Sequence, residues 1–186
     1  MISDPISTLL DGVESLRSKN QLQGQENAPT KSVGVASVLA ALNSFTEIVR
    51  YLNNRRSKGA VLEMTSEAAV QDVLFVMLRP WVLDLVYENP NDKVAGSFSI
   101  KDFVSHSGKF VVEAKYIRSS DHGKRISIEL NDDIENYRYH RSCDDLIFFI
   151  YDPDGYIPDA AAVERHLSTN RVYDGKTLRC HAVIKP

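Results

Sequence analysis

A chain of 186 residues with 43% hydrophobic content can build one core of ordinary domain size, which excludes a wholly disordered protein. Its net charge of −3 excludes non-specific coating of nucleic acid by a positive field, but it leaves local recognition open. The longest apolar stretches, 33–42 and 146–151, are too short to cross a bilayer, and the N-terminus lacks a signal-type pattern. We therefore expect a soluble, cytoplasmic protein without a membrane partner.

The first 60 residues are predicted to form a helical segment of their own. Apolar residues between Ile6 and Leu16 indicate a short amphipathic helix, and the polar stretch 18–32 indicates a loop. From Val35 to Leu52 the apolar positions alternate steps of three and four, which predicts a second helix and thus an N-terminal helical hairpin. The seam favours packing on another helix or a second copy, with core packing within the chain as an equal alternative. We expect residues 1–60 to serve dimerisation or partner docking.

Residues 61–186 are predicted to form a mixed α/β domain that begins with a helix. Thr65 or Ser66 can cap this helix, its apolar residues from Val70 recur at helical spacing, and Pro80 ends it. Glu67 and Gln71 fall on or beside the apolar face, where a carboxylate is unusual unless a polar group lies beneath it. The alternative is that Glu67 only faces the positive end of the helix dipole.

Two carboxylates are predicted to meet on a β-hairpin. Residues 81–88 are a strand candidate, and strands over 98–104 and 109–116 are separated by a turn at 105–108. Asp102 and Glu113 then lie on neighbouring antiparallel strands, and Lys115 shares the face of Glu113. Carboxylate oxygens suit Mg²⁺, and an adjacent ammonium can orient or deprotonate an attacking water. The pattern therefore favours metal-dependent phosphodiester hydrolysis.

The remaining elements complete the α/β pattern. We expect a helix over 126–139, a strand over 146–151 buried on both faces, a turn at 152–155, a helix over 159–167 and a final strand over 178–184. The segment between Lys115 and Arg125 carries a local positive surplus from residues that include Arg118, Lys124 and Arg125. It could dock a phosphate backbone, or it could be a solvated, flexible loop. Cys143 and Cys180 have no metal-type spacing, so we expect both to be structural.

Several segments resemble the PD-(D/E)xK nuclease superfamily, and most closely the restriction endonucleases of the DpnII/MboI kind. They are the helix at 66–74, the acid-bearing strand Ala95 to Phe103, the catalytic strand Val111-Val112-Glu113-Ala114-Lys115, the helix at 133–137 and the segment 148–155. The resemblance covers about residues 61–186. It implies a restriction-endonuclease-like α/β (α+β) fold, in which helices flank a mixed central sheet.

The resemblance also implies roles for individual residues. Asp102, Glu113 and the main-chain carbonyl of Ala114 would be metal ligands, Lys115 would position water or stabilise the transition-state charge, and Glu67 would add a further acid. The residue before Asp102 is Lys101, so the literal Pro-Asp pair is absent, but only the acid coordinates metal. Weaker candidates are Gln71, for DNA contact, Glu88 and Tyr137.

These roles imply a Mg²⁺-dependent DNA endonuclease, with Mn²⁺ as a substitute, that acts in restriction or anti-phage defence. Its partners would be DNA and either a second copy or a defence-complex protein that binds the N-terminal helices. One alternative is a catalytically silent or partner-activated nuclease-fold subunit that serves binding or assembly. Another is a nuclease that acts on RNA or on branched or damaged DNA.

Overall fold

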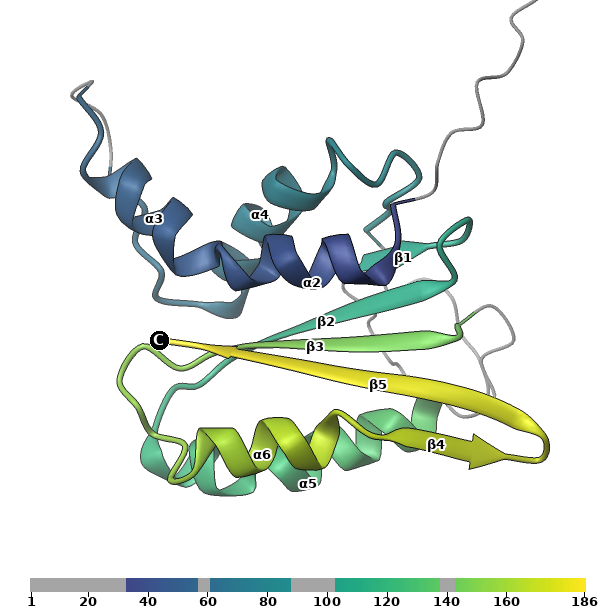
Figure 1. Cartoon of the computed structure of the whole chain (residues 1–186). Helices are drawn as coiled ribbons and strands as arrows, with labels where there is room; N and C mark the ends of the chain where they lie inside the picture. The colour runs from purple at the N-terminus through teal and green to yellow at the C-terminus, as the bar shows by residue number, and fades with distance from the viewer. Residues whose placement is uncertain (1–32, 57–60, 88–102, 138–142) are drawn as a thin grey trace, which may run out of the picture. The chain divides into compact units, whose positions relative to one another are not determined.

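The computed structural model describes residues 33–56, 61–87, 103–137 and 143–186 (Figure 1). Contacts divide the chain into two units, Met1–Lys31 and Ser32–Pro186, and all of the described residues belong to the second. The predicted helix at 6–16, the loop at 18–32 and the predicted strand residues 98–102 lie outside the described residues. The predicted role of residues 1–60 in dimerisation or partner docking stays a prediction.

A five-stranded mixed sheet forms the centre of the second unit. Its spatial order is β1-β2-β3-β5-β4. Its strands are β1 (Phe103–Ser105), β2 (Phe110–Tyr116), β3 (Asp145–Tyr151), β4 (Asn170–Tyr173) and β5 (Lys176–Lys185). Strands β2, β3 and β5 run parallel, whereas β1 and β4 are antiparallel to their neighbours. The apolar run of β3 lies between two parallel neighbours and is buried through Ile150, as its composition predicts.

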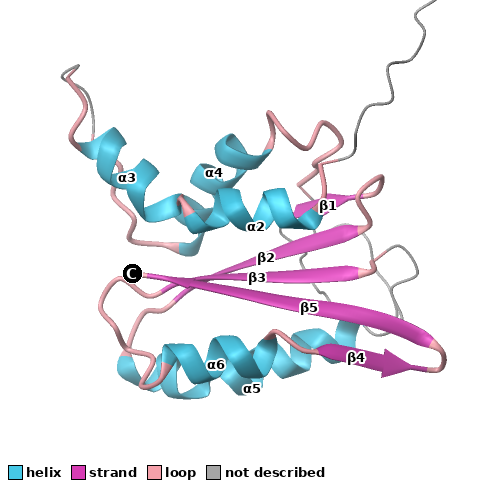
Figure 2. Cartoon of the chain, in the orientation of Figure 1, coloured by secondary structure: helices cyan, strands magenta, loops and turns pink. Residues whose placement is uncertain are grey.

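Helices cover both faces of this sheet (Figures 1 and 2). One face carries α2 (Val35–Asn43), α3 (Phe45–Asn53) and α4 (Glu67–Leu78), and the other carries α5 (Ser120–Tyr137) and α6 (Ala160–Leu167). Alternate residues of β2 enter the two cores, with Val112 packed on the α2–α4 side and Val111 on the α5–α6 side. This arrangement confirms the predicted restriction-endonuclease-like mixed fold.

Helix α4 follows its sequence signals closely. The Ser66 side chain accepts a hydrogen bond from the Ala69 N–H at 3.2 Å and caps the helix. All five predicted apolar positions are buried: Val70, Val73, Leu74, Met77 and Leu78. The stripe anchors α4 on the sheet and fixes where Glu67, its first residue, is held.

The predicted helix over 35–52 is wrong in one respect, because the structure breaks it into α2 and α3 at Ser44 with a bend of 42°. The Asn43 and Ser44 side chains both hydrogen-bond to carbonyls one turn earlier, a competition with the helix backbone that favours a break. Val38 and Phe45 lie in the core beside α4 and the sheet, so the seam packs within the chain. Among the described helices, no single one has the length and hydropathy to span a membrane; only this bent pair passes that test.

Two other expectations need correction. Residues 79–84 form turns in place of the predicted strand at 81–88, with only an isolated bridge between Val86 and Val104. Strand β4 was not expected, although Asp174-Gly175 marks it as half of a β-hairpin. Both of these residues have positive φ, of 47° and 82°, as a two-residue hairpin turn requires.

The N-terminal half of α5 packs tightly on the turn after β3, through Gly123. A Cβ at this position would lie 2.4 Å from the Tyr156 carbonyl oxygen. That turn is itself fixed, because the Asp152 carboxylate accepts the N–H groups of Tyr156 and Ile157, each at 2.8 Å. The backbone of the turn therefore cannot easily move away.

We predict that Gly123→Ala lowers the free energy of unfolding by about 1–3 kcal/mol, because the added methyl group would clash with the Tyr156 carbonyl and shift α5 away from the turn. Urea unfolding followed by circular dichroism measures the change. Gly34→Ala is the matched control, since its Cβ would meet nothing within 4 Å. Equal stability of the two variants would contradict this packing.

Candidate active site

Glu113 and Lys115 project from β2 toward helix α5. They alternate with Val112 and Ala114, which enter the core on the opposite face. Glu113 is only 4% exposed, which is rare for a carboxylate without partners. Successive residues on the same face of a strand are about 6.6 Å apart. The acid Glu113 and the amine Lys115 are therefore neighbours on one side of β2.

Tyr137, in the last turn of α5, supplies a partner for Glu113. Its hydroxyl donates a short hydrogen bond to Glu113 Oε1. Burial raises the pKa of Tyr137, and the charge and hydrogen bond of Glu113 raise it further. The phenol therefore stays protonated at neutral pH and remains a donor, which stabilises the buried carboxylate.

Lys115 is held by two acids of α5. Its Nζ lies 3.3 Å from Glu129 Oε1 and 3.5 Å from Asp133 Oδ2, and its side chain is only 17% exposed. His122 Nε2 lies 3.4 Å from the other oxygen of Glu129. His122, Glu129, Asp133 and Tyr137 follow one another at intervals of seven, four and four, so they form one polar stripe along α5.

The charges around Lys115 decide its protonation state. Burial alone would lower the pKa of Lys115, but nearby negative charges outweigh burial and raise the pKa. In decreasing order of effect these are Asp133, Glu113, Glu129 and Glu67. Lys115 is therefore a cation at neutral pH, which favours electrostatic stabilisation or water orientation and disfavours proton abstraction by a neutral amine.

Glu67 and Gln71 lie on the first two turns of α4. Glu67 is half-buried, and its charge reaches Lys115. Gln71 is half-buried too, and its Oε1 accepts a hydrogen bond from the Tyr87 hydroxyl at 3.3 Å. The structure thus brings Glu67 into the electrostatic surroundings of Lys115, whereas Gln71 contacts Tyr87.

The basic residues after β2 lie at the start of α5. Because this helix begins at Ser120, six residues before the predicted start, Lys124 and Arg125 are helical, and the flexible-loop alternative is wrong for them. Both side chains are exposed, as is that of Arg118 just before the helix. Lys124 Nζ lies 3.7 Å from an Asp121 carboxylate oxygen, and Arg125 Nε donates to the Asp121 carbonyl at 3.2 Å.

Asp102 lies outside the described residues. The hairpin predicted to carry it is present, since β1 and β2 pair antiparallel and end their described register at Phe103 opposite Val112. Within the described ranges, no group of three or more His, Cys, Asp or Glu side chains is placed to hold a metal ion. The described donors are the buried carboxylate of Glu113 and the neighbouring main chain of Ala114.

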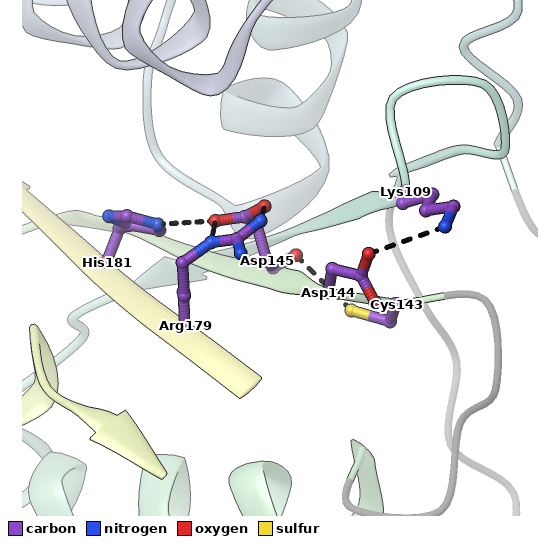
Figure 3. A network of polar contacts seen from close by, with 6 residues as sticks. All are labelled: Lys109, Cys143, Asp144, Asp145, Arg179 and His181. Atoms are coloured by element: carbon purple, nitrogen blue, oxygen red, sulfur yellow. Dashed lines mark hydrogen bonds and ion pairs between the residues drawn. The ribbon is translucent and has the colours of Figure 1, made fainter. Parts of the chain in front are cut away.

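A second polar network lies on the other face of the sheet, at the start of β3 (Figure 3). The Asp145 carboxylate accepts hydrogen bonds from Arg179 Nε at 2.8 Å and Arg179 Nη2 at 2.5 Å, and its Oδ1 lies 2.9 Å from His181 Nε2. Asp145 is 3% exposed, and Asp144 beside it pairs with Lys109 at 3.6 Å. This network was not predicted, because its members are 34 and 36 residues apart and meet only once β3 and β5 pair.

The order of these elements, an opening helix, an antiparallel hairpin, a crossover helix and a buried parallel strand, is that of a restriction-endonuclease-like fold. A family model for DpnII–MboI restriction endonucleases, REase_DpnII-MboI, matches residues 36–181. The chain belongs to this family, a family of DNA endonucleases. No curated protein and no solved structure matches the chain.

Restriction endonucleases typically need a divalent metal, and the chemistry of the described donors fits one. Glu113 is a buried carboxylate, and its neighbour Ala114 offers a main-chain carbonyl, which are both hard oxygen ligands. The nearby Lys115 cation would complement the negative charge of a phosphate brought there. Glu113 and Ala114 are thus suited to Mg²⁺ or Mn²⁺.

We predict that Asp145→Ala lowers the free energy of unfolding by about 2 kcal/mol, because it removes charge-assisted hydrogen bonds that join β3 to β5. Asp144→Ala, the control, removes only an exposed ion pair and should cost less than about 1 kcal/mol. Urea unfolding at pH 7 measures both values. Equal costs would show that the Asp145 network contributes no more than the surface pair.

We further predict that the stability difference between the wild type and Asp145→Asn narrows in acid. Burial alone would raise the pKa of Asp145, but the hydrogen bonds from Arg179 and His181 outweigh burial and hold the pKa below its usual range. The stability that this lowered pKa contributes is present above the pKa of the unfolded chain and is lost as pH falls through the folded pKa. Urea titrations from pH 6 down to pH 3 test this, and a difference independent of pH would contradict it.

Proposed function

We propose that this chain is a Mg²⁺-dependent endonuclease that hydrolyses phosphodiester bonds of DNA in restriction or anti-phage defence. The single observation that carries the proposal is that a buried acid, Glu113, and a cationic Lys115 lie on one side of β2, within a fold shared with restriction endonucleases.

Asp102 is proposed as the second acidic ligand. It directly precedes Phe103, and Glu113 directly follows Val112, the partner of Phe103 in the hairpin. If this register continued by one residue, Asp102 would stand opposite Glu113, and directly opposite residues of an antiparallel pair project to the same face. Two carboxylates and the Ala114 carbonyl would then share one cation.

Each residue of the site has a distinct part in the proposed reaction. A bound Mg²⁺ supplies charge neutralisation at the phosphate and a more acidic water. Glu113, which accepts a hydrogen bond from Tyr137, and Asp102 would hold the metal. Lys115, whose raised pKa favours the cation at neutral pH, would orient the attacking water and stabilise the negative charge that develops on the phosphate. Glu67 would add a further acid to the site.

DNA would approach along the start of α5. Arg118, Lys124 and Arg125 are exposed there, three and more residues after Lys115 in sequence. Basic side chains and the first N–H groups of a helix both attract phosphate. Gln71 of α4 is a further candidate contact. A two-fold dimer formed through residues 1–60, or a defence-complex partner bound there, would complete the proposed assembly.

We predict that Asp102→Ala, Glu113→Ala and Lys115→Ala each reduce DNA cleavage at least about 100-fold, because each removes a metal ligand or the stabilising cation. The assay uses plasmid and oligonucleotide DNA with Mg²⁺ or Mn²⁺, and EDTA should abolish cleavage by the wild type. Fold and DNA binding of each variant are checked by circular dichroism and by gel shift.

The matched control is Asp132→Asn, which removes an exposed charge from α5. It should cleave like the wild type. Cleavage that persists in all three site variants would reject the proposed site. A wild type that cleaves no DNA, RNA or branched substrate with either metal would instead favour a silent subunit.

A further inference from the structure

Helix α5 makes contacts to Lys115 that the proposed chemistry does not itself require. Glu129 and Asp133 lie one turn apart and approach the same ammonium, at 3.3 and 3.5 Å. Both come from the crossover helix between β2 and β3, whereas the proposed metal ligands come from the hairpin. Lys115 therefore forms its ion pairs with a helix, α5, that carries none of the proposed metal ligands.

A second contact, from His122, helps to hold the Glu129 carboxylate in place. The Arg118 N–H donates to His122 Nδ1 at 3.3 Å, so Nδ1 is the acceptor and a ring proton lies on Nε2. That nitrogen lies 3.4 Å from Glu129 Oε2, while the other oxygen, Oε1, faces Lys115. One carboxylate thus bridges a histidine and the lysine.

The helix that carries these residues is firmly seated. Ile126, Leu130 and Ile134 of α5 are almost fully buried against the sheet, and Gly123 lies tightly against the turn at Tyr156. A lysine side chain has four rotatable bonds, so by itself it defines the place of its charge poorly. Two carboxylates on a packed helix restrict it to a narrow region.

We propose that Asp133, Glu129 and His122 are positioning residues that fix the Lys115 ammonium for the cleavage step. They act through Lys115 and do not touch the substrate. The inference rests on the proposed function, because it assigns them to the same site. It predicts that their loss affects the chemical step more than substrate binding, since misplacing a catalytic group by about 1 Å can cost about 100-fold.

The first arm of the test measures steady-state cleavage by Asp133→Asn, Glu129→Gln, their double variant and His122→Leu. The control is Asp132→Asn, which has the same charge change as each single acid variant and lies on the same helix. We expect kcat to fall about 10- to 100-fold in the double variant with KM within about twofold. Asp133→Glu, which keeps the charge, should retain more activity than Asp133→Asn. A double variant with unchanged or raised kcat would overturn the proposal.

The second arm is independent of nuclease activity. Lysines are acylated at neutral pH with a water-soluble succinimidyl ester, and mass spectrometry compares the rate at Lys115 with that at the exposed Lys109. Loss of both acids should free Lys115 and raise its relative labelling severalfold, while Asp132→Asn leaves it unchanged. Unchanged labelling in a folded double variant would overturn the claim that Glu129 and Asp133 restrain Lys115.

The two arms separate failure of the inference from failure of the proposed function. A wild type that cleaves DNA, beside a double variant that does so equally well, rejects the positioning role alone. A wild type without cleavage rejects the proposed function and with it any role in catalysis, yet the labelling still decides whether α5 holds Lys115.

Discussion

The burial of an acid and an amine on one side of β2 is the constraint that organises the α5 face of this domain. Taking Glu113 and Lys115 out of water is unfavourable unless each finds partners of complementary charge or hydrogen-bonding capacity. Helix α5 supplies them, Tyr137 for Glu113 and Glu129 and Asp133 for Lys115. Helix α5 therefore has a polar stripe beside its apolar one. The same packing that holds α5 on the sheet also fixes the positions of Glu113 and Lys115.

The two faces of the sheet differ in the polar side chains that they hold. The face covered by α2, α3 and α4 is mainly hydrophobic core, and the Asp145 network at the start of β3 is one of its polar features. The face covered by α5 and α6 combines a second core with the acid, the lysine and their partners. A strand between two packed layers gives Glu113 and Lys115 a rigid base, which the proposed catalytic site would need.

Much of this arrangement was predictable because it depends on local signals. The cap at Ser66 and the apolar run from Leu146 each carry a strong short-range pattern, and the structure confirms both. The predicted hairpin turn is present too, but it spans residues 106–109, because Ser105 still pairs with Phe110 as the last residue of β1. The start of α5 was missed because Ser119 to Arg125 is polar, and its one buried residue there, Gly123, has no side chain to mark it. The partners of Lys115 were missed because ion pairs between strand and helix depend on tertiary packing, although Glu129, Asp133 and Tyr137 do recur at helical spacing.

The most direct test of the account is to locate a bound metal. Crystals soaked in Mn²⁺ should show an anomalous peak within bonding distance of a Glu113 carboxylate oxygen, with Asp102 as a second ligand, and Glu113→Gln crystals should lose the peak. A peak elsewhere, or a Glu113 carboxylate that stays bonded to Tyr137 without metal at saturating Mn²⁺, would contradict the central claim.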